Sequence, residues 1–250
     1  MISKNQIKYV HQLELKKFRK QEGLYIAEGH KVVGDLLKAG FVPKHIFATK
    51  EWLSQNHFAN TIEVSNEELT RLSLLQHPQQ VLALFPIPKN TLSSCDLFQE
   101  NQLSLFLDNI QDPGNLGTII RIADWFGIDT IFCSEGTVDA WNPKVIQATM
   151  GSIARVNMIY TDSTEFFNSL PSDYPIYGTF LDGQNIYAQQ LSQHGVIVMG
   201  NEGNGISDTV RAHVTHKLLI PDFHNGNTAD SLNVAIATAI TCSEFCRRRL

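Results

Sequence analysis

The sequence lacks several features that would assign it to a class at once. Its 250 residues contain no apolar run of about 18 residues, so we expect no transmembrane helix. The first 20 residues are polar and basic without an apolar centre, which is not the pattern of a secretory signal. Cysteine is scarce, and its four irregularly spaced residues favour a reduced, cytoplasmic setting over a disulfide framework.

Motifs of several enzyme classes are also missing. The sequence contains no G-x-x-x-x-G-K-[ST] phosphate loop, no H-E-x-x-H pair and no G-x-S-x-G elbow. The nine histidines are dispersed without metal-ligand spacing. Cys242 and Cys246 would lie one turn apart on a helix, which leaves a metal pair open, but packing is the preferred interpretation. We therefore expect no metal site.

The charge of the chain is unevenly distributed. A net charge of −5 argues against a general nucleic-acid binder, yet residues 1–50 contain ten Lys or Arg against four Asp or Glu. The basic residues nearest the N-terminus are Lys4, Lys8, Lys16, Lys17, Arg19 and Lys20. They predict either a surface that attracts a phosphate backbone or a solvated helix face.

The first part of the chain alternates between helix and strand patterns. Helix patterns occupy residues 4–20 and 32–39. Strand patterns occupy residues 24–27, 42–49 and 81–85. This alternation predicts a small α/β domain over residues 1–88. Pro86 and Pro88 break helix and ladder alike, so residues 89–102 are interpreted as a linker.

A second alternating series fills residues 103–250. Its strand patterns are residues 103–107, 130–133, 176–180, 196–199 and 216–220. Its helix patterns are residues 115–126, 144–150 and 231–248. Strands this apolar, separated by helices, predict an α/β domain with a parallel sheet covered on both faces.

Glycines follow one of these apolar strands. The loop Gly200–Gly205 has the spacing G-x-x-G-x-G and comes late in the chain. A dinucleotide site would need G-x-G-x-x-G in an early βαβ unit, so this loop does not predict one. Because glycine lets backbone approach a ligand closely, the loop indicates either a binding site or a plain turn.

The last helix pattern is small and apolar, so it is expected to be buried, with one polar position inside it. Ser231 would cap this helix, and Asn233 would lie one turn inside a small, apolar segment. An asparagine there needs a polar partner, unless it only ties down a loop. Because the chain contains both this asparagine and the Gly200–Gly205 loop, we favour a functional site over a role in the loop alone.

Asn115 and Arg121 belong to an earlier helix pattern. Asn115 is expected to begin this helix, and Arg121 lies six residues further on a different turn. Arg121 must therefore reach along the helix or across to another chain. An arginine on so apolar a helix indicates an anionic partner, either a substrate group or a structural carboxylate.

Taken together, these segments resemble the three motifs of the SpoU/TrmH family of RNA ribose methyltransferases. The motif segments are residues 109–121, 196–205, and 220–221 with 231–234. Residues 141–144 and 150–152 also resemble the family, and the likeness covers about residues 103–250. Residues 23–29 resemble the ribosomal-protein-like RNA-binding domain often fused ahead of this catalytic domain.

The resemblance implies a fold and a cofactor. The expected fold is a Rossmann-like parallel sheet whose C-terminal segment forms a deep trefoil knot, preceded by a small ribosomal-protein-like α/β domain. S-adenosylmethionine would bind in the knot. The implied contacts are Gly200, Ile220 and Leu232 first, with Thr179 and Leu181, expected on a loop after a strand, and Asn201 as secondary choices.

It also implies catalytic roles and a dimer. Arg121 resembles the family arginine that activates the ribose 2′-hydroxyl; because arginine stays protonated, we favour stabilisation of a developing alkoxide. The residues that match the frame of this site are Asn115, Glu202, Ser231 and Asn233. The family is dimeric, with the site near the subunit interface, so a homodimer is expected.

The predicted function is transfer of a methyl group from S-adenosylmethionine to a ribose 2′-hydroxyl, with ribosomal RNA preferred over transfer RNA. A non-catalytic RNA-binding factor in ribosome assembly is the alternative of another class, and base methylation is a third. One departure from the family pattern is the nine-residue segment between Pro221 and Ser231, which is longer than usual. It includes His224, which contacts substrate or only solvent.

Overall fold

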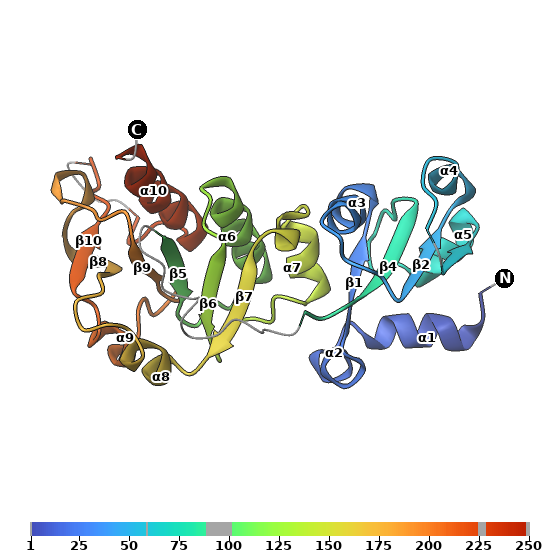
Figure 1. The fold of residues 1–250 in the computed structure, drawn as a ribbon, viewed down its shortest axis with the longest axis horizontal. Coiled ribbons are helices and arrows are strands. Elements are labelled where there is room, and N and C mark those ends of the chain that lie inside the picture. Colours follow the sequence, from blue (N-terminus) through green and yellow to red (C-terminus); the bar gives the residue numbers. More distant parts are fainter. Residues whose placement is uncertain (1, 59, 89–101, 225–228, 249–250) are drawn as a thin grey trace. The chain divides into compact units, whose positions relative to one another are not determined.

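The computed structural model describes residues 2–58, 60–88, 102–224 and 229–248. The chain divides into two compact units (Figure 1). The N-terminal unit comprises residues 1–89 and 139–155, and the C-terminal unit comprises residues 90–138 and 156–250. The predicted linker lies outside the described residues except for Gln102. No helix in the described ranges is long and apolar enough to cross a membrane.

The N-terminal unit contains a four-stranded mixed sheet. Its strands in spatial order are β1 (Leu24–Glu28), β4 (Val81–Pro86), β2 (His45–Ala48) and β3 (Thr61–Glu63). β4 runs antiparallel to β1 and β2, while β2 and β3 are parallel. The helices before β4 are α1 (Lys4–Gln12), α2 (Lys16–Glu22), α3 (His30–Lys38), α4 (Lys50–Leu53) and α5 (Asn66–Leu72). The predicted α/β alternation is therefore present. The prediction that Pro86 breaks the ladder is wrong, because Pro86 is the last residue of β4 and pairs with Leu24 of β1.

The single helix predicted over residues 4–20 is wrong, because the structure has two helices there. Ser3 caps α1 with a reciprocal bond to Gln6, and α2 begins after Leu15. Leu15 has extended backbone angles that end the helical path. Leu13 is fully buried in the core at this break, so packing of one leucine overrides the helical pattern.

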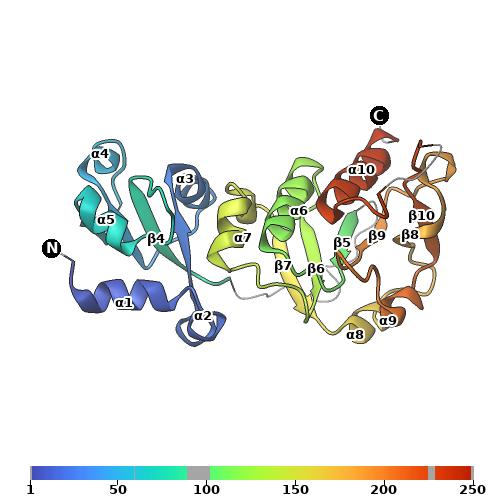
Figure 2. The same ribbon diagram turned by 180° about the vertical axis from the view of Figure 1, so that it is seen from behind.

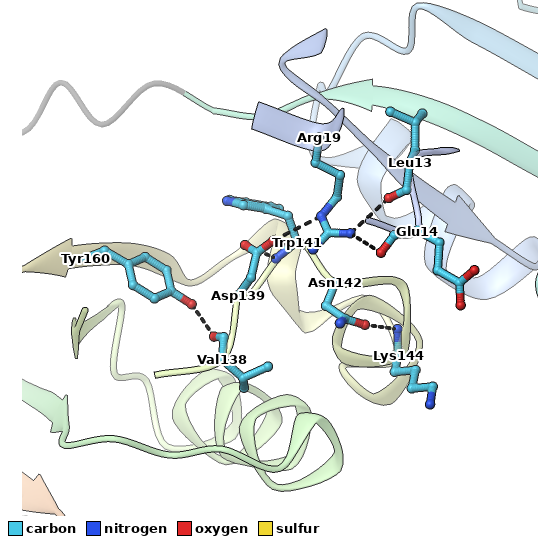
Figure 3. A network of polar contacts seen from close by, with 9 residues as sticks. All are labelled: Leu13, Glu14, Arg19, Val138, Asp139, Trp141, Asn142, Lys144 and Tyr160. Atoms are coloured by element: carbon cyan, nitrogen blue, oxygen red, sulfur yellow. Dashed lines mark hydrogen bonds and ion pairs between the residues drawn. The ribbon is translucent and has the colours of Figure 1, made fainter. Parts of the chain in front are cut away.

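Arg19 was predicted to contribute to a basic surface, and this is also wrong. Its side chain is buried, with 1% of the residue exposed. It donates to Oδ2 of Asp139 through Nε at 3.0 Å and Nη2 at 2.5 Å (Figure 3). Its Nη1 donates to the carbonyl oxygens of Leu13 and Glu14 at 2.9 and 2.6 Å. The guanidinium thus fastens the α1–α2 break to a distant carboxylate, as buried arginines generally do.

Asp139 belongs to residues 139–155, which come late in the sequence but are part of the N-terminal unit. Residues 139–155 contain α7 (Pro143–Ala148) and the short 3-10 helix η1 (Ser152–Ala154). Asn142 caps α7 by accepting from the backbone N–H of Lys144 at 2.9 Å. The Trp141 ring lies 4.8 Å from the buried Tyr25 ring of β1, centroid to centroid. The N-terminal unit therefore packs residues from two distant parts of the chain.

The C-terminal unit is built on a six-stranded parallel sheet, which confirms the predicted α/β class. The strands in spatial order are β10 (His216–Leu219), β8 (Ile176–Asn185), β9 (Gly195–Met199), β5 (Leu103–Leu107), β6 (Thr130–Ser134) and β7 (Asn157–Thr161). All neighbouring pairs are parallel. β5, β6 and β9 are buried throughout, which explains their unbroken apolar sequences.

Helices cover this sheet. They are α6 (Pro113–Trp125), α8 (Ser163–Asn168), η2 (Ile186–Ala188), α9 (Asp208–Arg211) and α10 (Val234–Arg247). α6 and α10 pack side by side in both views (Figures 1 and 2), and α8 packs against α9. The aromatic rings of Phe106, Phe132, Phe166 and Phe167 join β5, β6 and α8 in one core cluster. The trefoil knot stays a prediction.

Candidate active site at the carboxyl ends of the strands

The three motif segments come together at one edge of the C-terminal sheet. The first and third segments follow β5 and β10, and the second contains β9 with the loop after it. β5 pairs directly with β9. The carboxyl ends of parallel strands share an edge, where α/β proteins bind ligands. Thr179 and Leu181 lie within β8, which continues to Asn185, so the predicted loop position of these two residues is wrong.

The Gly200–Gly205 loop folds back on itself. Asn201 and Gly205 exchange two backbone hydrogen bonds, each 2.9 Å long. A Cβ on Gly200 would lie 2.3 Å from the carbonyl carbon of Gly205 and from the nitrogen of Ile206. Gly205 has φ +69°, a conformation that disfavours other residues. This loop therefore requires glycine at both ends.

A cavity of about 560 Å³ opens beside this loop. All six residues predicted to bind the cofactor line it, namely Thr179, Leu181, Gly200, Asn201, Ile220 and Leu232. Glu202 and Ser231 also line it. The volume lies within the range of about 300–1,000 Å³ that small-molecule sites occupy. The Gly200–Gly205 loop is thus part of a cavity wall.

Glu202 connects the second motif to the first. Its Oε1 accepts from the backbone N–H of Asp112 at 3.2 Å and from Nδ2 of Asn115 at 3.0 Å. Its Oε2 accepts from the backbone N–H of Gln111 at 3.2 Å. Partial burial acts to raise the pKa of Glu202, but the hydrogen bonds from Asn115 and these amides outweigh it and lower the pKa. The carboxylate is therefore held in its charged form.

Asn233 connects the third motif to the first. Its Nδ2 donates to Oδ1 of Asn115 at 2.9 Å. Its Oδ1 accepts from the backbone N–H groups of Ala235 and Ile236, so Asn233 caps α10. The prediction that Ser231 caps this helix is wrong. Asn233 lies at the helix start, not one turn inside, and it is exposed, because the buried part of α10 begins at Val234. The hydrogen bonds from Asn233 to Asn115 and from Asn115 to Glu202 form one chain, which orients the side-chain amides of both asparagines.

The chain matches two known protein families. The SpoU rRNA Methylase family model matches residues 102–243. The chain belongs to this family. A second model, the MRM3-like substrate binding domain, matches residues 4–83.

Similar proteins cover nearly the whole chain. The 23S rRNA (guanosine(2553)-2′-O)-methyltransferase RlmP of Bacillus subtilis is 29% identical over 244 residues, 95% of each chain. A Porphyromonas gingivalis structure assigned to the TrmH family of RNA methyltransferases is 38% identical, with a TM-score of 0.88 over 99% of each chain. An AdoMet-bound rRNA methyltransferase from Sinorhizobium meliloti is 29% identical, with a TM-score of 0.88 over 100% of this chain and 97% of that one.

Within this family site, α6 begins two residues earlier than predicted. Asp112 caps the helix by accepting from the backbone N–H of Asn115 at 2.8 Å, and Pro113 occupies the first helical position. Asn115 is therefore in the first turn, not the residue that begins the helix. Its side chain does not cap the helix and instead forms hydrogen bonds with Glu202 and Asn233.

Arg121 is exposed on α6, and within the described ranges no hydrogen bond or ion pair joins its side chain to another residue. The structural carboxylate considered for it is thus not among the described residues. One turn further along α6, Trp125 is 85% exposed. Neither Arg121 nor Asn115 nor Asn233 lines the cavity.

Sequence patterns did not predict several residues of the site. Arg211 and Asp182 line the cavity and form an ion pair of 2.6 Å, and the Arg211 guanidinium lies 4.5 Å from the Phe180 ring centroid. Their separation in sequence leaves no local pattern to find. In the long segment before Ser231, Phe223 and His224 are exposed, while residues 225–228 lie outside the described residues.

Proposed function

We propose that this protein transfers a methyl group from S-adenosylmethionine to a ribose 2′-hydroxyl of ribosomal RNA. The observation that carries the proposal is the hydrogen-bonded chain from Glu202 through Asn115 to Asn233. It joins all three family motifs beside a cavity lined by Glu202. Two relatives support the reaction and the substrate class by their names: one is a 23S rRNA 2′-O-methyltransferase and the other an AdoMet-bound rRNA methyltransferase.

The cavity suits the cofactor. It combines backbone at Gly200 and Ile220 with apolar side chains such as Leu181, Leu218 and Leu232. Such a surface fits a flat base and a ribose with few charged contacts. S-adenosylmethionine, when bound, supplies a methyl group already activated on a positively charged sulfur. Among the described residues, no group of three or more His, Cys, Asp or Glu could hold a metal ion.

Arg121 is assigned to the reacting hydroxyl. A ribose hydroxyl is weakly acidic, so attack on a methyl group develops negative charge on its oxygen. A guanidinium stays protonated and stabilises that charge through N–H donors. Its exposure and its lack of a partner among the described residues leave it available to RNA or to a second copy of the chain.

Glu202, Asn115 and Asn233 are assigned to orientation of the ribose and of neighbouring backbone. Each asparagine amide carries a second N–H hydrogen beyond the bond that it makes in the chain. Those hydrogens are available to a ribose oxygen. Ser231 is exposed on the cavity wall and supplies a further hydroxyl there.

The N-terminal unit is assigned to RNA binding. Its match to a substrate binding domain and the lysines of α1 and α2 support this assignment. Because residues 139–155 group with this unit, deletion of residues 1–88 would remove their packing partners. Reversal of charge at Lys16 and Lys17, which are exposed on α2, is a sharper test. It should weaken RNA binding at low salt and leave cofactor affinity unchanged.

A homodimer is part of the proposal. α6 and α10 pack together and carry exposed large apolar residues, with Trp125 85% and Ile236 51% exposed. Burial of these residues against a second copy would also bring Arg121 of α6 to the interface. We expect Trp125→Glu to shift the sedimentation coefficient to that of a monomer and to lower activity. We further propose a cytoplasmic location, consistent with the free thiols of Cys133, Cys242 and Cys246.

The deciding experiment is transfer of labelled methyl from S-adenosylmethionine to unmodified ribosomal RNA and, in parallel, transfer RNA, followed by alkaline hydrolysis. Label in alkali-resistant dinucleotides of ribosomal RNA supports the proposal, since a methylated 2′-oxygen cannot cleave its phosphodiester. Label in mononucleotides would indicate a base, and label in transfer RNA alone would replace the substrate. Absence of label on RNA and on ribosomal particles, with cofactor bound, would favour the non-catalytic assembly factor.

Arg121→Ala is the variant that separates these outcomes. The enzyme should lose transfer by about 100-fold or more while cofactor affinity is unchanged. Arg121→Lys is the matched control for charge, and it should recover little activity because the planar fork is lost.

A further inference from the structure

A buried carboxylate, that of Asp108, bonds to the residue that ends the segment after the Gly200–Gly205 loop. Asp108 follows β5 and is 1% exposed. Its Oδ2 accepts from the backbone N–H of Ser207 at 2.7 Å, and its Oδ1 accepts from Nδ2 of Asn109 at 2.8 Å. Ser207 is the residue at which the glycine loop passes into α9. Asp108 therefore holds the far end of the loop.

Asn109 holds the near end. Its carbonyl oxygen accepts from Nδ2 of Asn201 at 2.7 Å. Oδ1 of Asn201 in turn accepts from the backbone N–H groups of Gly203 and Asn204 at 2.9 and 3.0 Å, which shapes the turn around Glu202. The loop is thus fixed on both sides of Glu202 by two consecutive residues of another strand end.

Asn109 is itself fixed by its surroundings. It has φ +57°, a left-handed conformation that asparagine tolerates better than most residues. Its backbone N–H donates to Oγ of Ser134 at 2.8 Å. A Cβ on Gly136 would lie 1.9 Å from its Oδ1, so the neighbouring turn closes tightly over the side chain.

We propose that Asp108 and Asn109 are positioning residues for methyl transfer, which set the place of Glu202 by holding both ends of the loop from Gly200 to Ser207. This inference rests on the proposed function for its catalytic consequence. The loop also lines the cofactor cavity, so the same hold sets cofactor affinity. Neither residue contacts the cavity, so both act through the loop.

The chemistry of the carboxylate is specific. Asp108 accepts at both oxygens, and an amide in its place would present one N–H₂ group to an existing N–H donor. A buried donor without an acceptor is destabilising, so the loop should move away. Displacement of about 1 Å at a reacting site lowers rates by about 100-fold. Glu202 would at the same time lose the amides of Gln111 and Asp112.

The test uses the full chain with Asp108→Asn. Asn109→Gly is a second variant, which keeps the left-handed backbone and the carbonyl bond to Asn201 and removes the side-chain amide that donates to Asp108. Cofactor affinity is measured by calorimetry, methyl transfer by steady-state kinetics, and folding by thermal unfolding. We expect a tenfold or larger loss of cofactor affinity and of kcat in Asp108→Asn and a smaller loss of both in Asn109→Gly, with KM for RNA unchanged. Asp129→Asn is the control, because Asp129 is an exposed carboxylate of the same unit near β6.

Two readouts distinguish positioning from a purely structural role. The acid limb of the pH–rate profile should move to higher pH in Asp108→Asn, because the displaced Glu202 loses the amides that lower its pKa. In a Glu202→Gln background, Asp108→Asn should add little further loss in kcat. A lower melting temperature with unchanged cofactor affinity and kcat would overturn the inference, as would full additivity with Glu202→Gln.

Failure of the proposed function gives a different result. If the unaltered chain transfers no methyl group, the function is overturned and the kinetic readouts fall away. Cofactor affinity of Asp108→Asn and Asn109→Gly then decides the positioning proposal alone. Affinity equal to that of Asp129→Asn in both variants would reject it.

Discussion

Asn233 donates through Nδ2 to Oδ1 of Asn115 at 2.9 Å, across a separation of 118 residues in sequence. The same Asn233 side chain caps α10 through its Oδ1, so one residue both starts a helix and orients a neighbour. A helix cap is rigid because backbone N–H groups fix its oxygen. The Asn115 amide is therefore held by a side chain whose own position is fixed by the start of α10.

These two roles of Asn233 can be separated by substitution. Asp is as good a cap as Asn and favours the helix N-terminus, but it has no N–H to donate to Asn115. Asn233→Asp should therefore keep the melting temperature and lower kcat about tenfold, as loss of one hydrogen bond of about 1.4 kcal/mol implies. Asn233→Ala should lose both, with about 1 kcal/mol less stability from the missing cap. Equal activity in Asn233→Asp and the unaltered chain would contradict the role of the bond.

Two glycines of one loop should respond differently to the same substitution. At Gly200 a Cβ would lie 2.3 Å from backbone atoms of Gly205 and Ile206, so Gly200→Ala must open the loop. Strain of about 1–3 kcal/mol predicts a loss of cofactor affinity of about 5- to 150-fold. At Gly203 the nearest atom is Oδ1 of Asn201 at 3.6 Å, an ordinary contact. Gly203→Ala is thus the matched control, and calorimetry should find its affinity within about twofold of the unaltered chain.

The charge of Glu202 predicts the pH dependence of the site. The pKa of Glu202 in the folded protein is below the ordinary 4.5. The contribution of its charge to cofactor affinity is therefore present above pH 4.5 and is lost as the pH falls through the folded pKa. Cofactor affinity of the unaltered chain relative to Glu202→Gln should therefore be constant from pH 8 to about pH 5. The ratio should fall only in more acid solution. A ratio that titrates near pH 6 would mean that the amides of Gln111 and Asp112 do not hold the carboxylate.

Much of the C-terminal unit could be predicted from the sequence. Fully buried parallel strands such as β5 and β9 leave unbroken apolar runs, and glycines such as Gly200 mark a tight loop. The cavity brings together all six residues predicted to bind the cofactor, although their contacts with it stay a prediction. Local patterns sufficed here because each strand end carries its own motif.

The rest required partners that are distant in sequence. Arg19 looks like a surface residue in a basic helix, and only Asp139, 120 residues away, shows why it is buried. Ser231 has the chemistry of a helix cap, but the helix starts where Asn233 meets Asn115. Asp108 and Asn109 carry no local signal of a role, because their donors are on the Gly200–Ser207 segment. Such pairings are tertiary and override local propensity.

The buried pair of Arg19 and Asp139 should dominate the stability of the N-terminal unit. Their side chains are 2% and 13% exposed, so removal of one partner leaves a charge with little water. Asp139→Asn should lower the free energy of unfolding by about 3 kcal/mol. Asp182→Asn is the matched control, since its pair with Arg211 is exposed at the surface and screened by solvent. Urea unfolding followed by fluorescence should give a lower midpoint for Asp139→Asn alone. Equal midpoints would mean that the α1–α2 break and residues 139–155 are held by apolar contacts such as Tyr25 with Trp141.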